Sequence, residues 1–131
     1  MIQLQQRSSS PIYEQIVEQM KELVAKDIMK AGDKVPSVRE LSSTLLINPN
    51  TVSKAYQELE RQGVIQTIRG KGTFILEPSV PRMAAERIEA LRQELQRLTV
   101  EAKHLGMTKA QFREMVDEAS HMLGEGYHAA D

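Results

Sequence analysis

The sequence contains no cysteine, which excludes disulfide bonds and thiolate metal sites and allows a reducing compartment. It also lacks any apolar run long enough to cross a bilayer, and its amino end has no basic segment followed by an apolar one. We therefore expect a soluble protein in the cytoplasm.

A large excess of charge of either sign is also absent. The formal net charge is -1, and aromatic residues make up 4% of the 131 residues. Overall charge therefore does not indicate a nucleic-acid partner, and any basic surface must be local. Residues 37–72 carry a modest local excess, with five Lys or Arg against three Asp or Glu.

Groups typical of catalysis are few. A chain of this length has no room for a large catalytic domain, and no nucleophile stands at a useful spacing from a base. Asp117 and His121 are four residues apart, but without further clustered ligands they are better interpreted as a solvated helix face than as a metal site. We expect no enzymatic activity, no cofactor and no metal site.

The most informative stretch, residues 48–63, carries the start and stop signals of one helix. Asn48 can cap it, Pro49 suits its first position, and Gly63 suits a left-handed residue after its end. Apolar residues recur at helical spacing on one face, which leaves amides, hydroxyls and cations on the other. Such a surface can reach base edges and phosphates. Taken alone, the stretch is also compatible with an ordinary surface helix.

A second helix is predicted immediately before this one. Ser37 and Glu40 have the spacing of a capping box, so a helix should begin at Val38 and run to about Leu46. The short separation of the two helices is typical of a helix-turn-helix, in which the second helix enters the major groove. Arg39 would then reach a phosphate or a groove edge from the first turn of the first helix.

The preceding residues predict simpler elements. Residues 2–5 alternate apolar and polar, which indicates a short strand. Ser10 and Pro11 resemble a cap and first helical position, and an apolar stripe reaching Ile28 predicts a helix that ends before Gly32. Residues 31–36 should form a turn.

A basic hairpin is predicted after the second helix. Residues 64–68 and 73–76 are rich in β-branched and apolar side chains, and the link 69–72 contains two glycines and two cations. This hairpin predicts a wing whose Arg and Lys can lie along a minor groove. A solvated hairpin tip is the alternative interpretation.

Four motifs between residues 11 and 76 resemble the winged-helix domain of the GntR family of bacterial transcription regulators: PIYEQI at 11–16, PSVREL at 36–41, NTVSKAY at 50–56 and RGKGTF at 69–74. The resemblance implies a double-stranded DNA operator as partner. The sequence departs from the family at Ser53, where many relatives carry Arg, and at Pro49, where some carry a polar residue. The residues that the resemblance implies as operator contacts are Ser37, Arg39, Asn48, Asn50, Thr51, Ser53, Lys54, Arg69, Gly70 and Lys71.

The remaining sequence predicts a two-helix tail. Two prolines within residues 77–81 mark a linker, and apolar residues then repeat with heptad spacing up to Leu105. Thr108 and Gln111 resemble a capping box that opens a last helix. Two such helices cannot enclose a core alone, so we expect a homodimer, with packing as a hairpin within one chain as the alternative. The short tail resembles the YtrA-type branch of the family. Its expected dimer interface consists of Ile88, Leu91, Leu95, Leu98, Leu105, Phe112, Met115, Val116 and Leu123.

The predicted fold is mostly α with a small β wing: a winged helix-turn-helix domain at residues 1–78, with its core at 11–76, followed by a dimerisation tail at 79–131. The predicted function is sequence-specific DNA binding by a transcription regulator, expected to be a repressor, that recognises a near-palindromic operator as a homodimer. A small-molecule effector bound between the tail helices is left open. The alternative is a winged-helix interaction module whose heptad tail docks a partner protein.

Overall fold

The computed structural model describes residues 2–5, 9–77 and 84–124. The chain forms two compact units, Met1–Ser79 and Val80–Asp131. The predicted domain boundary lies at residues 78–79, outside the described residues. None of the described helices is both long enough and apolar enough to cross a membrane.

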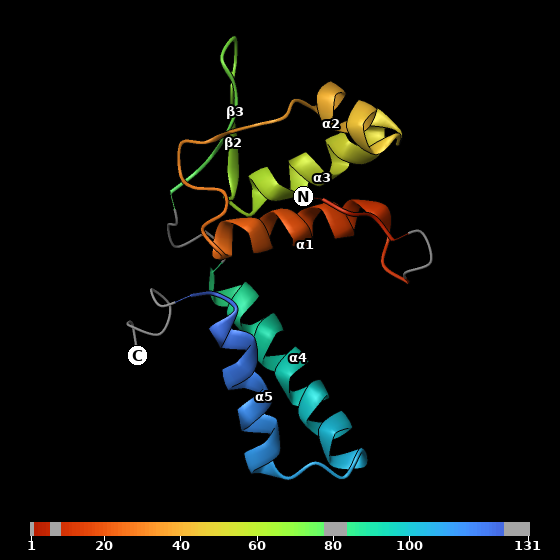
Figure 1. Ribbon diagram of the computed structural model, residues 1–131, viewed down its shortest axis with the longest axis vertical. Coiled ribbons are helices and arrows are strands. Elements are labelled where there is room, and N and C mark those ends of the chain that lie inside the picture. The colour runs from red at the N-terminus through yellow and green to blue at the C-terminus, as the bar shows by residue number, and fades with distance from the viewer. Residues whose placement is uncertain (1, 6–8, 78–83, 125–131) are drawn as a thin grey trace. The chain divides into compact units, whose positions relative to one another are not determined.

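The first unit contains three helices and a small sheet (Figure 1). In chain order its elements are α1 (Ile12–Ala25), β1 (Lys34–Val35), α2 (Val38–Leu45), α3 (Pro49–Arg61), β2 (Ile65–Ile68) and β3 (Gly72–Ile75). The three strands are antiparallel in the order β1-β3-β2. A helix-turn-helix followed by a β-hairpin is the winged arrangement, so the predicted fold class is confirmed.

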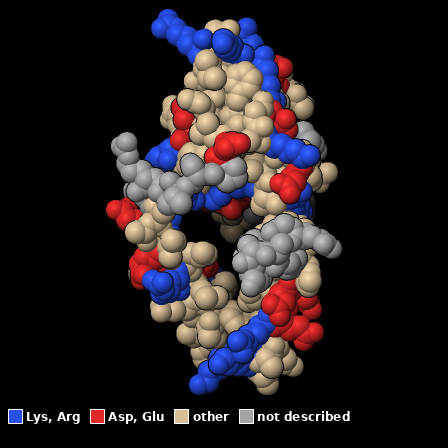
Figure 2. All heavy atoms as spheres, turned by 90° about the vertical axis from the view of Figure 1, so that its left-hand side faces the viewer, with Lys and Arg blue, Asp and Glu red and all other residues tan. Residues whose placement is uncertain are grey.

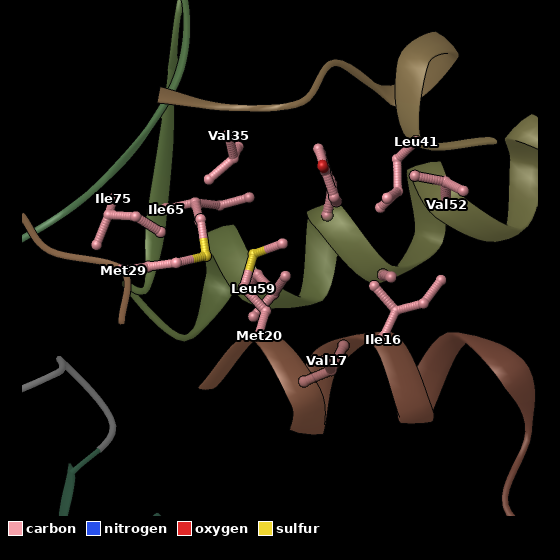
Figure 3. Close-up of a cluster of buried hydrophobic side chains, with 12 residues drawn as sticks. Ile16, Val17, Met20, Met29, Val35, Leu41, Val52, Leu59, Ile65 and Ile75 are labelled. Atoms are coloured by element: carbon pink, nitrogen blue, oxygen red, sulfur yellow. The ribbon is translucent and has the colours of Figure 1, made fainter. Parts of the chain in front are cut away.

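One apolar cluster holds these elements together. Figure 3 shows Ile16, Val17 and Met20 of α1 beneath Val52 and Leu59 of α3, and Ile65 and Ile75 bring the sheet to the same cluster. Burial of these side chains is the main stabilising term for the unit. It also fixes the opposite face of α3 towards solvent.

The second unit consists of α4 (Ala84–His104) and α5 (Lys109–His121). The capping box predicted at the start of α5 is confirmed: the Gln111 backbone N–H donates to Thr108 Oγ1 at 3.1 Å, and the Thr108 N–H donates to Gln111 Oε1 at 2.8 Å. Among residues 84–124, only Ala102 is buried. The two helices of one chain therefore leave most of their apolar side chains exposed.

Three local predictions between residues 10 and 36 were wrong. Residues 31–36 are not only a turn, because β1 pairs Lys34 with Phe74 and Val35 with Thr73. The helix α1 begins at Ile12 rather than Pro11 and has no side-chain cap from Ser10, whose carbonyl instead accepts from Gln15 Nε2 at 3.0 Å. It ends at Ala25, after which Asp27 adopts a φ of 60°, so Ile28 lies beyond the helix.

The predicted strand at residues 2–5 is also wrong, because this segment pairs with none of the described strands. Its backbone is bound by two glutamine side chains of α1. Gln19 pairs with the N–H and carbonyl of Gln3 at 2.7 and 2.6 Å, and Gln15 pairs with those of Gln5 at 2.8 and 3.0 Å. Gln15 and Gln19 are four residues apart on a helix, a rise of about 6 Å. Gln3 and Gln5 are two residues apart, which in an extended chain is about 6.7 Å, so each glutamine side chain meets one backbone residue.

Candidate nucleic-acid interface

The N-terminal end of α3 is exposed and polar, as the sequence predicted. Asn48 Oδ1 accepts from the Asn50 N–H at 2.8 Å, and Pro49 is the first helical residue. The buried face carries Val52, Ala55, Tyr56 and Leu59, which anchors the helix on the core. Of the predicted contact residues of this helix, Asn48, Asn50 and Lys54 are exposed, whereas Thr51 and Ser53 are partly buried.

The start of α2 is also exposed and polar, with a hydroxyl at Ser37 and a guanidinium at Arg39. The Glu40 N–H donates to Ser37 Oγ at 3.0 Å, and the Ser37 N–H donates to Glu40 Oε1 at 3.2 Å, which confirms the predicted capping box. The pKa of the Glu40 carboxyl is lowered, chiefly by this backbone hydrogen bond from Ser37. The Ser37 hydroxyl hydrogen can still be donated, and Arg39 is exposed.

Tyr56 joins α3 to the chain that enters α2. Its hydroxyl donates to the Pro36 carbonyl at 2.6 Å, and the side chain is 6% exposed. Burial raises the pKa of Tyr56 to about 12, and the charge of Glu40 adds to the shift. This hydrogen bond ties the start of α2, which carries Ser37 and Arg39, to α3.

A Tyr56→Phe variant should be less stable than the wild type at neutral pH by about 1 kcal/mol, the net value of one hydrogen bond. Because the pKa of Tyr56 is raised in the folded state, its contribution is complete below the ordinary pKa of 10.0 and is lost as the pH rises through about 12. Urea unfolding of both proteins across this range measures the difference. A stability difference that stays constant up to pH 12 would contradict the assignment.

The wing presents its cations at the tip. Ile68 pairs with Gly72, so Arg69, Gly70 and Lys71 form the loop, and the Lys71 N–H donates to the Ile68 carbonyl at 2.9 Å. Gly70 has a φ of 81°, a conformation that favours glycine. All three loop residues are exposed. Figure 2 shows Lys and Arg side chains gathered at the upper end of the molecule, where Figure 1 places this hairpin tip.

The cations of this surface are not neutralised by carboxylates of the described residues. Lys26, Arg61, Arg92 and Arg97 form ion pairs within 4.0 Å. Arg39, Arg69 and Lys71 take part in none of them. Lys54 is also outside these pairs, and its Nζ lies 4.0 Å from the centroid of the Tyr13 ring, in a cation–π contact. None of the four predicted DNA-contacting cations therefore has to break an ion pair with a described residue before it can bind a phosphate.

Two residues near this surface were missed by the sequence analysis. Tyr13 received no role there beyond its place in the motif PIYEQI, yet its ring contacts the ammonium group of Lys54 of α3. Lys34 was assigned to a turn, yet it belongs to β1 and its side chain lies beside Gly72 of the wing. No local pattern indicates either contact, because both join residues about 40 positions apart.

The predicted dimer-interface residues are only partly covered within a single chain. Phe112 and Leu123 are partly buried, and the other seven are exposed. Among the described residues, no three His, Asp or Glu side chains come together in a way that could hold a metal ion.

Comparison with known proteins places the fold and this surface in a family. The model of the gntR family of bacterial regulatory proteins matches residues 12–75. The chain is 49% identical over 120 residues to the HTH-type transcriptional repressor YtrA of Bacillus subtilis (strain 168), and the match covers 92% of each chain. That match includes the tail, so the resemblance to the YtrA-type branch is confirmed.

Solved structures agree with this assignment. A crystal structure described as a transcriptional antiterminator from Listeria monocytogenes EGD-e is 40% identical, with a TM-score of 0.86 over 95% of this chain and 94% of that one. The DNA-binding domain of AraR in complex with operator ORX1 is 26% identical, with a TM-score of 0.51 over 57% of this chain and 94% of that one. The chain therefore belongs to the GntR family of bacterial regulatory proteins and is a DNA-binding transcription regulator.

Proposed function

We propose that the protein is a repressor that binds a near-palindromic operator as a homodimer and has no catalytic role. The main support for DNA binding through this surface is a set of exposed cations without carboxylate partners among the described residues, near the polar N-terminal end of α3. These cations are Arg39, Lys54, Arg69 and Lys71. Phosphates neutralise such cations and release counterions, which makes binding strongly dependent on salt. B. subtilis YtrA, named as a repressor, supports the direction of regulation.

The base-reading role belongs to the polar side chains near the N-terminal end of α3, the exposed Asn50 and Lys54 and the partly buried Ser53. Asn50 has both a donor and an acceptor for a base edge, the geometry that pairs with adenine in the major groove. Asn48 already uses Oδ1 to cap the helix, so only its amide N–H groups remain for a phosphate. Ser53 is shorter than the Arg of many relatives, so it contributes less to the reading of guanine.

The homodimer is supported by the exposed heptad stripe of α4. Leu91, Leu95 and Leu98 are 69%, 49% and 40% exposed in a single chain. An apolar stripe of this length gains stability when a second helix covers it. A second copy also supplies a second DNA-binding unit, so two half-sites one helical turn apart, about 34 Å, are occupied together.

The experiment that tests the function is sequencing of the DNA that co-purifies with the protein in cells, followed by footprinting on the recovered fragments. We expect protection of a symmetric operator site. We also expect the protein in the cytoplasm of a bacterium, where it can reach this DNA. The alternative, a module that docks a partner protein through the tail, gives no such footprint. Equal retention of random and recovered fragments would reject the regulatory role.

The second unit contains a groove in which a small-molecule effector could bind. This groove between α4 and α5 is lined mainly by apolar groups, including Leu95, Phe112 and Val116. The same side chains belong to the expected dimer interface, so a ligand there would compete with dimerisation or alter its geometry.

Loss of a wing cation should lower the affinity for DNA without changing the sequence preference. Lys71→Ala should weaken binding almost equally on all DNA sequences and reduce the magnitude of the salt slope by about 1 for each phosphate that the variant no longer neutralises. Titrations over a range of salt concentrations measure the slope. Lys30→Ala is the matched control, because Lys30 is exposed in the same unit but lies in the turn next to the opposite end of β3. An unchanged slope for Lys71→Ala would show that the wing does not touch phosphate.

A further inference from the structure

Lys34 has an unusual position on the outer face of the sheet. Val35 is buried, so the alternation of β1 directs Lys34 to the opposite face. Lys34 pairs with Phe74, and its side chain extends along β3 towards Gly72. A Cβ built on Gly72 would lie 2.7 Å from Lys34 Cε and 3.4 Å from Nζ, so the end of the lysine occupies the space that a side chain would need.

Lys34 also stands only three residues before Ser37, the N-cap of α2. The charge of Lys34 is among the causes that lower the pKa of the Glu40 carboxyl, and Glu40 is the third residue of α2. Gly72 directly follows Lys71 in the chain, and Glu40 directly follows Arg39. Lys34 thus reaches the residue after the wing cation, and its charge acts on the residue after the helix cation.

Lys34 is exposed and takes part in none of the ion pairs within 4.0 Å among the described residues. Its side-chain end lies over the position where Gly72 lacks a Cβ. An exposed ammonium without a carboxylate partner can neutralise a phosphate.

We propose that Lys34 is a further phosphate-binding residue, which joins the wing and the start of α2 into one continuous contact with the DNA backbone. This inference rests on the proposed DNA-binding function. The glycine at position 72 has two roles in it: its φ of 126° permits the turn into β3, and the absent Cβ leaves room for Lys34.

The test is a salt titration of Lys34→Gln, with a duplex of about 30 base pairs that the wild type selects from a random library, and a random duplex of the same length. We expect weaker binding to both duplexes by a similar factor, and a salt slope smaller by about 0.9 for each phosphate that is no longer neutralised, or about 1.8 for a dimer. Lys34→Arg should keep the wild-type slope, and Lys30→Gln, which removes the same charge near the other end of β3, should also keep it.

A second background separates a direct contact from an indirect one. Glu40→Gln removes the carboxylate charge and keeps the capping box, because glutamine can take the same place in it. If Lys34→Gln still reduces the slope in that background, Lys34 meets phosphate directly. An effect that disappears there, or an unchanged slope in the wild-type background, overturns the inference. A wild-type protein that selects no duplex from the library overturns the proposed function itself.

Discussion

Leu98→Glu should convert the protein to single chains and weaken operator binding about 10²- to 10⁴-fold, the gain that linking two binding units supplies. Leu98 lies in the heptad stripe of α4 and is 40% exposed in one chain. In a single chain a glutamate at this position can therefore reach water. In a dimer the same carboxylate would be buried without a partner, which costs several kcal/mol.

Sedimentation equilibrium measures the first effect against the 14.8 kDa mass of one chain, and mobility-shift titration on the selected duplex measures the second. Val100→Glu is the matched control, since Val100 is 58% exposed on the same helix and lies two residues away, on the opposite face from the stripe. It should keep both the dimer and the affinity. A Leu98→Glu protein with twice the mass of one chain would reject the expected interface.

The elements that could be predicted from the sequence are those fixed by neighbours in the chain. Both capping boxes, the Asn48 cap and the glycine after α3 depend on residues within four positions of one another, and all are present. The strand β1 could not be predicted, because two residues have no periodicity and form a strand only by pairing with β3 about 40 positions later. The segment at residues 2–5 has a strand-like alternation, but glutamine side chains bind its backbone.

The candidate site follows the same division. The polar face of α3 could be predicted because its opposite face is apolar at helical spacing, and the core confirms that separation. The sequence could not show which cations are already paired. Arg61 lies on the same helix as Lys54, yet its guanidinium is bonded to Glu58, three residues earlier. Which of the predicted residues touch an operator stays a prediction.

Arg39→Ala should weaken binding to the selected duplex by about 1 to 3 kcal/mol for each guanidinium removed, which is roughly 5- to 150-fold in affinity at each half-site. Arg39 is exposed in the first turn of α2, outside every described ion pair, and Tyr56 fixes the position of that turn through Pro36. Removal of its guanidinium therefore leaves no carboxylate unpaired, and the measured decrease in affinity reports the DNA contact.

The kind of contact follows from comparing selected and random duplexes in the same mobility-shift titrations. A contact to a base edge makes Arg39→Ala lose more affinity on the selected duplex, whereas a phosphate contact gives equal decreases on both. Arg39→Lys should keep a phosphate contact but lose the two parallel hydrogen bonds that a guanidinium makes with guanine. Arg61→Ala is the control, because Glu58 already binds its guanidinium. If Arg39→Ala and Arg61→Ala bind the selected duplex equally well, the first turn of α2 does not anchor the protein on DNA.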